Sequence, residues 1–108
     1  MNYLFDVLWD GIKVGEVSKT ENKYVYKYYT KGVEEAKNKG FDYIVGFKDL
    51  NRIYESEQLF SVFSSRIFPK NRHDIDKRLK ELGINEYNEI EILKKTNGKC
   101  FTDKIEVR

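Results

Sequence analysis

The side chains that could do nucleophilic, acid–base or metal chemistry are few and scattered in this chain. His73 could act as a general base, but it begins a charged segment that offers no evident partner. Cys100 follows Lys99, whose charge could lower the pKa of the thiol, although a small apolar role at the start of a strand is favoured. One cysteine and one histidine cannot supply a four-ligand zinc site. We therefore predict neither catalytic residues nor a metal site.

Phosphate-binding and kinase motifs are also missing. Gly11 and Gly15 flank a short segment, but they lie in a predicted hairpin and not in front of a helix. The catalytic-loop and metal-binding motifs of protein kinases do not occur. Asp103 and Glu106 are interpreted as solvated residues of a sheet edge. The sequence thus predicts a protein that is not an enzyme and needs no cofactor.

One segment interleaves aromatic and basic side chains in the pattern of a strand. Exposed tyrosines with flanking lysines could stack unpaired bases, at ~1–3 kcal/mol per base. More often, such rings cover a small core while their hydroxyls stay in water. A face for single-stranded nucleic acid is therefore kept as an alternative, although direct contact with nucleic acid is not favoured. Its residues would be Tyr24, Tyr26, Tyr28, Lys23 and Lys27.

A basic loop follows the most aromatic part of the chain. These charges could simply be the solvated start and outer face of a helix. They could instead dock on an acidic partner surface, where rim charges mostly set the association rate. The segment contains Lys70, Asn71, Arg72, His73, Lys77 and Arg78.

The elements that would position these residues begin with a meander of three strands. Residues 3–9 and 12–17 alternate with the period of two that is typical of strands. Asp10-Gly11 between them tolerates the positive φ angles of a tight hairpin turn. A two-residue turn would place Trp9 opposite Ile12, and Val7 opposite Val14. A third strand is predicted over residues 23–29.

Helices and short strands are predicted in the rest of the chain. Residues 32–38 favour a short polar helix before Gly40. This helix is followed by a β-like apolar patch over residues 41–47 and by a short strand at Ile53-Tyr54. Ser56 is the predicted N-cap of a broadly buried helix over residues 59–67 that ends before Pro69.

Two further helices and a last strand complete the prediction. The helices cover residues 73–82, capped by Gly83, and 88–96, ending at Asn97-Gly98. Residues 104–107 alternate again and should return to the sheet as a closing strand. We therefore predict an α+β fold with an antiparallel N-terminal meander, three to four helices and a closing C-terminal strand, in a single domain over residues 1–108.

Composition limits the class of protein further. Twenty basic and 18 acidic residues leave a net charge of +2, which argues against a general polyanion binder. The single cysteine cannot form an internal disulfide, as expected in a reducing cytosol. No apolar run approaches the ~18 residues of a membrane span, and no signal peptide is recognisable. A cytoplasmic protein is expected.

Several short motifs together resemble the N-terminal domain of the HipA family of toxin kinases. Residues 4–7, Asp10-Gly11 and residues 14–17 are similar to the family's opening hairpin. Residues 59–69, LFSVFSSRIFP, look like its aromatic helix, which ends at a proline. Leu82-Gly83-Ile84 and residues 92–100 resemble its later helix end and turn.

The resemblance implies regulation rather than catalysis. In full-length HipA proteins this domain lies on the N-lobe of a Ser/Thr kinase. In bacterial toxin–antitoxin systems of three components (HipB, HipS and HipT), it is a separate subunit, HipS, that restrains the kinase. The expected partner is thus a HipA- or HipT-type kinase, together with a HipB-like DNA-binding protein, and no membrane is involved.

Binding to a kinase would need a few anchors on a rigid scaffold. A standard interface buries ~800 Å² on each partner. Loop position and residue type select candidate anchors, provided that the aromatic ones are exposed. They are Phe47, Lys48, Arg52, Tyr54, Phe68, Lys70, Asn71 and Arg72. A scaffold or targeting module with another kind of partner remains an alternative.

Overall fold

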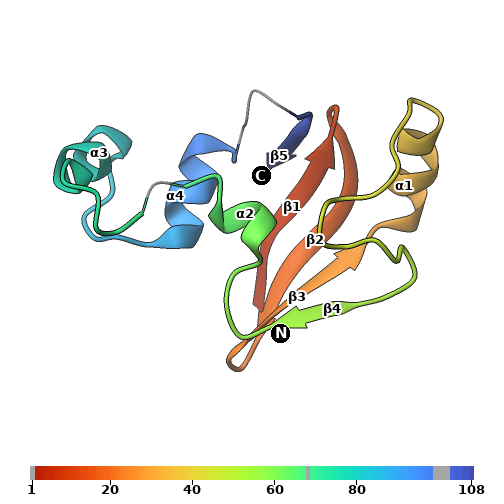
Figure 1. Cartoon of the computed structure of the whole chain (residues 1–108), viewed down its shortest axis with the longest axis horizontal. Helices are drawn as coiled ribbons and strands as arrows, with labels where there is room; N and C mark the ends of the chain where they lie inside the picture. The colour runs from red at the N-terminus through yellow and green to blue at the C-terminus, as the bar shows by residue number, and fades with distance from the viewer. Residues whose placement is uncertain (1, 68, 99–102) are drawn as a thin grey trace.

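Five antiparallel strands and four helices make up the computed structural model, which describes residues 2–67, 69–98 and 103–108. The strands lie in one sheet in the order β4-β3-β2-β1-β5. The predicted α+β class, with N-terminal strands and a closing C-terminal strand, is confirmed (Figure 1). In chain order the elements are β1 (Asn2–Trp9), β2 (Ile12–Thr20), β3 (Lys23–Tyr28), α1 (Thr30–Lys37), β4 (Tyr54–Ser56), α2 (Ser61–Ser64), α3 (Ile75–Leu82), α4 (Glu89–Thr96) and β5 (Ile105–Val107).

The first hairpin turns at Asp10-Gly11, as predicted, with φ angles of 53° and 82°. Trp9 pairs with Ile12, but Val7 pairs with Gly15 and not with Val14 as expected. The register shifts by one residue between Val7 and Leu8, so that β2 contains an extra residue there. This irregularity places Gly15 directly beneath the side chain of Tyr26, where an added Cβ would lie 2.2 Å from the hydroxyl oxygen.

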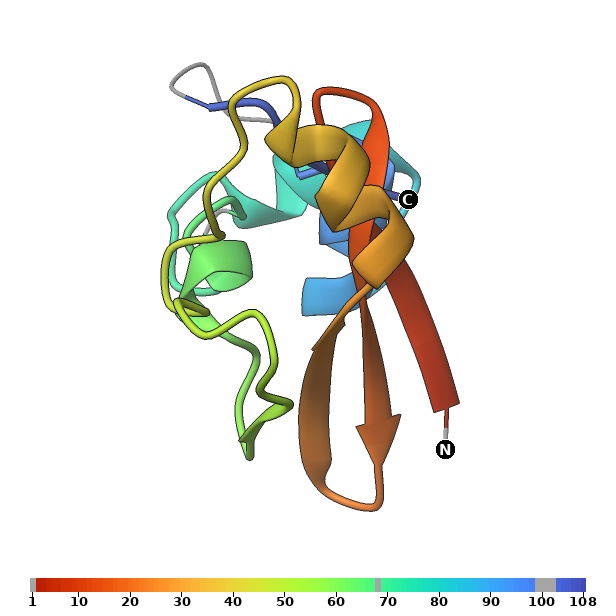
Figure 2. The same ribbon diagram turned by 90° about the vertical axis from the view of Figure 1, so that its right-hand side faces the viewer.

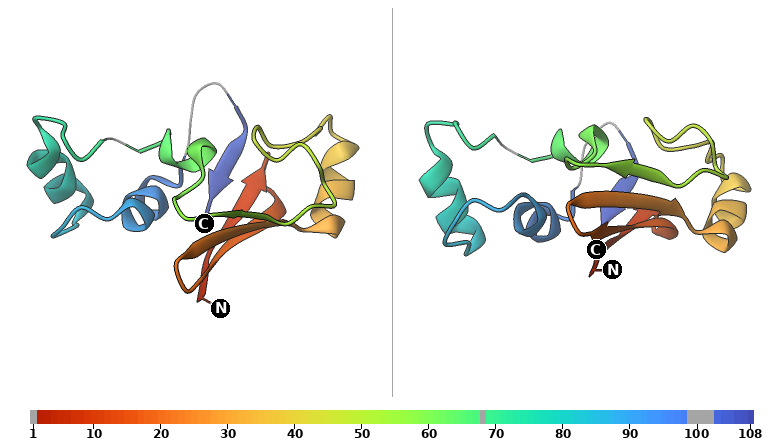
Figure 3. Two further views of the ribbon diagram at one scale, coloured as in Figure 1. Left: turned by 60° about the horizontal axis from the view of Figure 1, so that its bottom comes forward. Right: turned by 90° about the horizontal axis from the view of Figure 1, so that it is seen from below.

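The main core lies on one face of the sheet. Phe5, Val17 and Tyr26 come from three neighbouring strands, are fully buried, and lie under Phe63 of α2. The segment between α1 and β4 lies on the same side of the sheet as α2 (Figures 2 and 3). On the opposite face, Lys13 forms ion pairs with Asp6 and Glu16.

The predicted long helix over residues 59–67 is wrong. Only Ser61–Ser64 is helical, and Ser56 belongs to β4, where its hydroxyl accepts a hydrogen bond from Gln58 N. The apolar spacing has another cause: Phe60 precedes the turn in an extended conformation, and its ring contacts Phe47. A single turn between irregular segments thus presents the same apolar side chains to the core.

A smaller core joins α3 and α4 at one end of the molecule, which measures 41 × 32 × 18 Å (Figure 1). Its buried residues are Leu79, Ile84 and Ile92. Both helices end as predicted, in left-handed residues, because Gly83 has φ 74° and Asn97 has φ 58°. Over the described part of the chain, none of the helices has the length and apolar character needed to cross a membrane.

Candidate partner-binding surface

The segment between α1 and β4 carries an unusual share of exposed apolar side chains. Five large hydrophobic residues are exposed within the described ranges, and three of them lie in residues 42–53, here named the 42–53 loop. The three are Tyr43, Val45 and Ile53, and Val45 and Ile53 are the most exposed of all five, at 74% and 56%. Exposed apolar side chains that form a contiguous patch are typical of an interaction site.

The first half of this loop is fixed by a buried tyrosine. Residues 44–47 form a turn in which Phe47 N donates to Ile44 O at 2.8 Å, and Gly46 has a φ of 96°. The Tyr28 hydroxyl donates to Phe47 O at 2.5 Å and accepts from Ile44 N at 3.0 Å. One oxygen atom therefore connects both ends of the turn, and Val45 stands at its tip. Burial raises the pKa of Tyr28 to about 12, so the hydroxyl keeps its proton at neutral pH.

Aromatic packing supports the same turn from below. The Phe47 ring stacks on Tyr26 with centroids 4.1 Å apart and an interplanar angle of 6°. It also meets the edge of Phe60 at 5.0 Å. Such ring pairs contribute ~0.5–1.5 kcal/mol each beyond the area that they bury.

Tyr54 fixes the second half of the loop. Its hydroxyl accepts a hydrogen bond from Asp49 N at 2.8 Å, and the Asp49 carboxylate accepts one from Asn51 N at 2.9 Å. The Arg52 guanidinium lies 5.3 Å from the Tyr54 ring centroid, in a cation–π contact. Ile53 follows directly and points to solvent.

The structure corrects which residues of this loop are available to a partner. Phe47 was a predicted anchor, but only 2% of its surface is exposed, because its ring is part of the core. Tyr54 is half-buried and serves the loop itself, whereas Lys48 and Arg52 are exposed, as an interface would require. Val45 and Ile53 were missed. The Val-Gly pair at residues 45–46 could have indicated Val45, since glycine with positive φ often follows a turn's exposed tip.

The other predicted anchors do not join this surface. Phe68 lies outside the described residues. Lys70 and Asn71 are exposed, and Arg72 pairs with Asp74 at 2.5 Å just before α3. Figure 1 places α3 and α1 at opposite ends of the long axis, with the first part of the 42–53 loop beside α1. The eight predicted residues therefore belong to more than one surface.

The predicted nucleic-acid face is not available for stacking. Tyr26 and Tyr28 are 0% and 7% exposed, because this side of β3 faces the core. Lys27 projects from the other side of the strand, while Lys23 is exposed at its start. Only Tyr24 is partly accessible, and it lines a shallow groove with Lys70. A row of stackable rings would need all three tyrosines on the surface.

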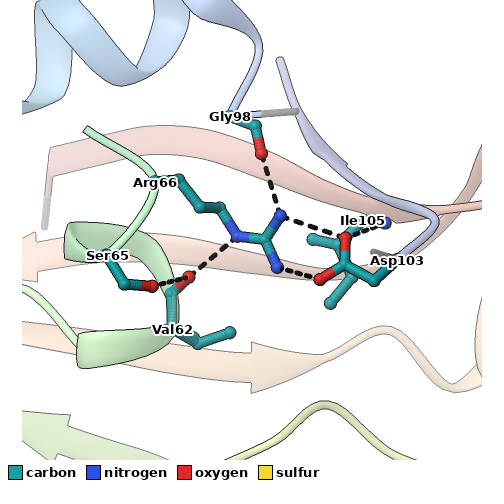
Figure 4. A network of polar contacts seen from close by, with 6 residues as sticks. All are labelled: Val62, Ser65, Arg66, Gly98, Asp103 and Ile105. Carbon is teal, nitrogen blue, oxygen red and sulfur yellow. Dashed lines mark hydrogen bonds and ion pairs between the residues drawn. The ribbon is translucent and has the colours of Figure 1, made fainter. Parts of the chain in front are cut away.

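An arginine that the sequence did not single out ties distant segments together (Figure 4). Arg66 donates from Nε to Val62 O at 2.8 Å and from Nη1 to Gly98 O at 3.0 Å. Its Nη2 lies 2.6 Å from Asp103 Oδ2, and Asp103 Oδ1 also accepts from Ile105 N at 3.1 Å. Asp103 is thus no freely solvated edge residue. The hydrogen bond from Arg66 lowers the pKa of its carboxyl group below the ordinary value of 3.8.

The described residues hold no group of three or more His, Cys, Asp or Glu side chains that could bind a metal ion. His73 is exposed, and Cys100 lies outside the described residues. Comparisons with protein-family models, with curated proteins and with solved structures find no match to this chain. Among the described residues, the 42–53 loop holds most of the exposed large apolar side chains.

Proposed function

We propose that this protein is a non-catalytic binding subunit that docks onto a partner protein through the 42–53 loop. One observation carries the proposal: the two most exposed large apolar side chains among the described residues, Val45 and Ile53, stand on a loop whose backbone is held by the hydroxyls of Tyr28 and Tyr54. Full burial of such a side chain in an interface contributes ~1.5–3 kcal/mol to the free energy of binding. Both together would provide a substantial part of a specific interface.

The rigidity of the loop supports binding in a second way. Association costs free energy when loops and side chains must become ordered. Tyr28 and Tyr54 already hold the loop backbone in the free protein, so little of that cost remains. Lys48 and Arg52 are exposed in the same loop, and charges at the rim of an interface favour an acidic partner surface and mainly raise the association rate.

The partner that we propose is a separately encoded HipA-type Ser/Thr kinase, in a cytoplasmic complex that includes a HipB-like DNA-binding protein. Support comes from the motifs that resemble the HipA N-terminal domain, above all the hairpin at Asp10-Gly11 and residues 59–69. In this proposal the protein acts as a HipS-like antitoxin that restrains the kinase. It acts by binding and catalyses no reaction of its own.

The test is whether a HipA-type kinase co-purifies with this protein. Replacing both Val45 and Ile53 by serine should weaken binding by about 100-fold, because two apolar contacts of ~1.5 kcal/mol are lost. Tyr3→Ser is the matched control, since Tyr3 is exposed to nearly the same extent as Ile53 (54% against 56%) but lies on β1. Val45, Ile53 and Tyr3 are all exposed, and substitutions at the surface usually change stability by only about 0.5 kcal/mol.

Three results would be informative. Loss of binding in the double variant alone supports the proposal, whereas equal loss in the Tyr3→Ser control, or no loss in either variant, contradicts the role of the loop. If no kinase binds but another protein is retained through Val45 and Ile53, the kinase assignment is wrong and a scaffold or targeting role replaces it.

A further inference from the structure

Tyr24 lies between two adjoining depressions, here named together the Tyr24 groove. The first has a volume of about 620 Å³ and is lined by Leu4, Lys19, Lys70 and the start of α4. The second lies toward the segment that precedes α2 and is lined by Glu57, Leu59 and Ser64. Tyr24 and Glu89 line both, so the two depressions adjoin.

The first depression offers an apolar floor. Leu4, Tyr24 and Ile90 are partly buried hydrophobic residues that pack against the main core. Their remaining exposed surface faces the groove. A long apolar side chain placed there would lose its contact with water without displacing any buried group.

The second depression has the opposite chemistry. Glu57 and Glu89 stand at its sides, and no basic residue lines it. Neither carboxylate forms an ion pair with any of the residues that the structure places. Tyr24 lines the same depression and adds an aromatic ring, which attracts cations. Carboxylates around an aromatic ring complement a guanidinium or an ammonium group.

The Tyr24 ring already makes one contact of this kind. Lys19 Nζ lies 5.1 Å from its centroid. An anion would have only two lysines, Lys19 and Lys70, and the N-terminus of α4 to attract it. At that N-terminus Glu89 and Glu91 already occupy the first turn, and Asn88 accepts the hydrogen bond from Glu91 N. The charges of the groove therefore favour a cationic occupant.

We infer that the Tyr24 groove binds a partner polypeptide segment in which an apolar side chain is adjacent to an arginine or lysine. The apolar side chain lies against Leu4 and Ile90, and the cationic group lies between Glu57 and Glu89. This inference goes beyond the proposed function, because it involves other residues than the 42–53 loop and requires no kinase.

The test uses the whole protein and two short probes, acetyl-Leu-Arg-amide and acetyl-Arg-Leu-amide, followed by nuclear magnetic resonance titration of backbone amides. We expect saturable shifts at Tyr24, Glu57 and Glu89 with at least one probe, with a dissociation constant on the order of 1 mM. Replacing the arginine by citrulline keeps its shape and removes its charge, which should weaken binding by about fivefold, as expected for partly exposed charge pairs.

A variant provides the matching control on the protein. The double variant Glu57→Gln with Glu89→Gln should weaken binding of the arginine probe about fivefold and leave binding of the citrulline probe unchanged. The control variant Glu34→Gln with Glu35→Gln, at exposed positions on α1, should change the affinity for neither probe. The inference is overturned if both probes fail to bind, if citrulline binds as well as arginine, or if the strongest shifts lie outside the groove. Tighter binding of acetyl-Leu-Glu-amide would identify an anion site instead.

Discussion

Replacing Tyr28 by phenylalanine removes the one oxygen atom that joins both ends of the 44–47 turn. The ring stays, so its apolar packing in the core is retained. Two hydrogen bonds are lost: the one to Phe47 O at 2.5 Å and the one from Ile44 N at 3.0 Å. Ile44 and Phe47 are both buried, so water cannot easily replace the missing partner.

The magnitude follows from these two bonds. A buried polar group that is left without a partner costs about 1–3 kcal/mol. We therefore expect Tyr28→Phe to lower the free energy of unfolding by about 2–4 kcal/mol. For a domain near this size each kcal/mol moves Tm by about 4–8 °C, so Tm should fall by roughly 8–32 °C.

Tyr26→Phe is the matched control. Tyr26 is fully buried one ring away, but its hydroxyl has no hydrogen-bond partner among the described residues. Its centroid lies 5.0 Å from that of Tyr28, so both changes remove a hydroxyl from the same cluster. Loss of an unpaired polar atom should leave stability unchanged or raise it by up to about 1 kcal/mol.

Chemical denaturation followed by circular dichroism measures both variants, and limited proteolysis reports on the 42–53 loop. We expect Tyr28→Phe to be less stable than Tyr26→Phe by at least about 2 kcal/mol, with faster cleavage in the loop. Equal stability of the two variants, or a larger loss in Tyr26→Phe, would refute the reasoning that the Tyr28 hydroxyl holds the loop.

Two further predictions concern contacts outside the loop. Asp103→Asn should destabilise the protein at neutral pH and flatten its acid denaturation curve: a folded-state pKa below 3.8 contributes stability that is present above the unfolded pKa and lost as pH falls through the folded pKa. Acid titrations of the wild type and the variant that coincide would contradict the ion pair with Arg66. Gly15→Ala should destabilise by about 1–3 kcal/mol or more, since its Cβ would lie 2.2 Å from the Tyr26 hydroxyl and 2.9 Å from Lys27 O. Adding Tyr26→Phe removes the contact with the hydroxyl but leaves the ring carbon Cζ 2.6 Å from the added Cβ, so it should restore only a small part of the stability, which thermal denaturation of the single and double variants can measure.

Local patterns were sufficient to predict much of this fold. Asp10-Gly11 fixed the hairpin position because its residues tolerate positive φ, and Gly83 and Asn97 marked helix ends for the same reason. The extra residue in β2 was not predictable. It coincides with the Tyr26 side chain lying over Gly15, which is a contact between strands and leaves no local signal.

The 59–67 segment shows where periodicity misleads. Leu59 and Phe63 lie at helical spacing and are both buried, yet only one turn is helical. Contacts with rings from distant segments, such as Phe5 at 5.3 Å from Phe63, fix the arrangement instead. Apolar spacing reports which side chains are buried, but several backbone paths can bury the same side chains.

The sequence singled out several residues of the 42–53 loop, but not the apolar side chains that the structure exposes there. Aromatic residues were predicted as anchors because they often anchor interfaces. A small core also needs large rings, and Phe47 is buried in the core. Val45 and Ile53 are ordinary core residues by type, so their exposure depends on tertiary structure. Likewise, the Arg66–Asp103 pair joins residues that are 37 positions apart, and neither residue alone indicates the other.

Hydrogen exchange of the free protein and of its complex tests the docking claim most directly. The proposed mode of binding predicts that amides near Val45 and Ile53 gain protection in the complex, while the face of the sheet around Lys13 exchanges as before. A complex that protects the face around Lys13 and leaves the 42–53 loop unchanged would contradict it.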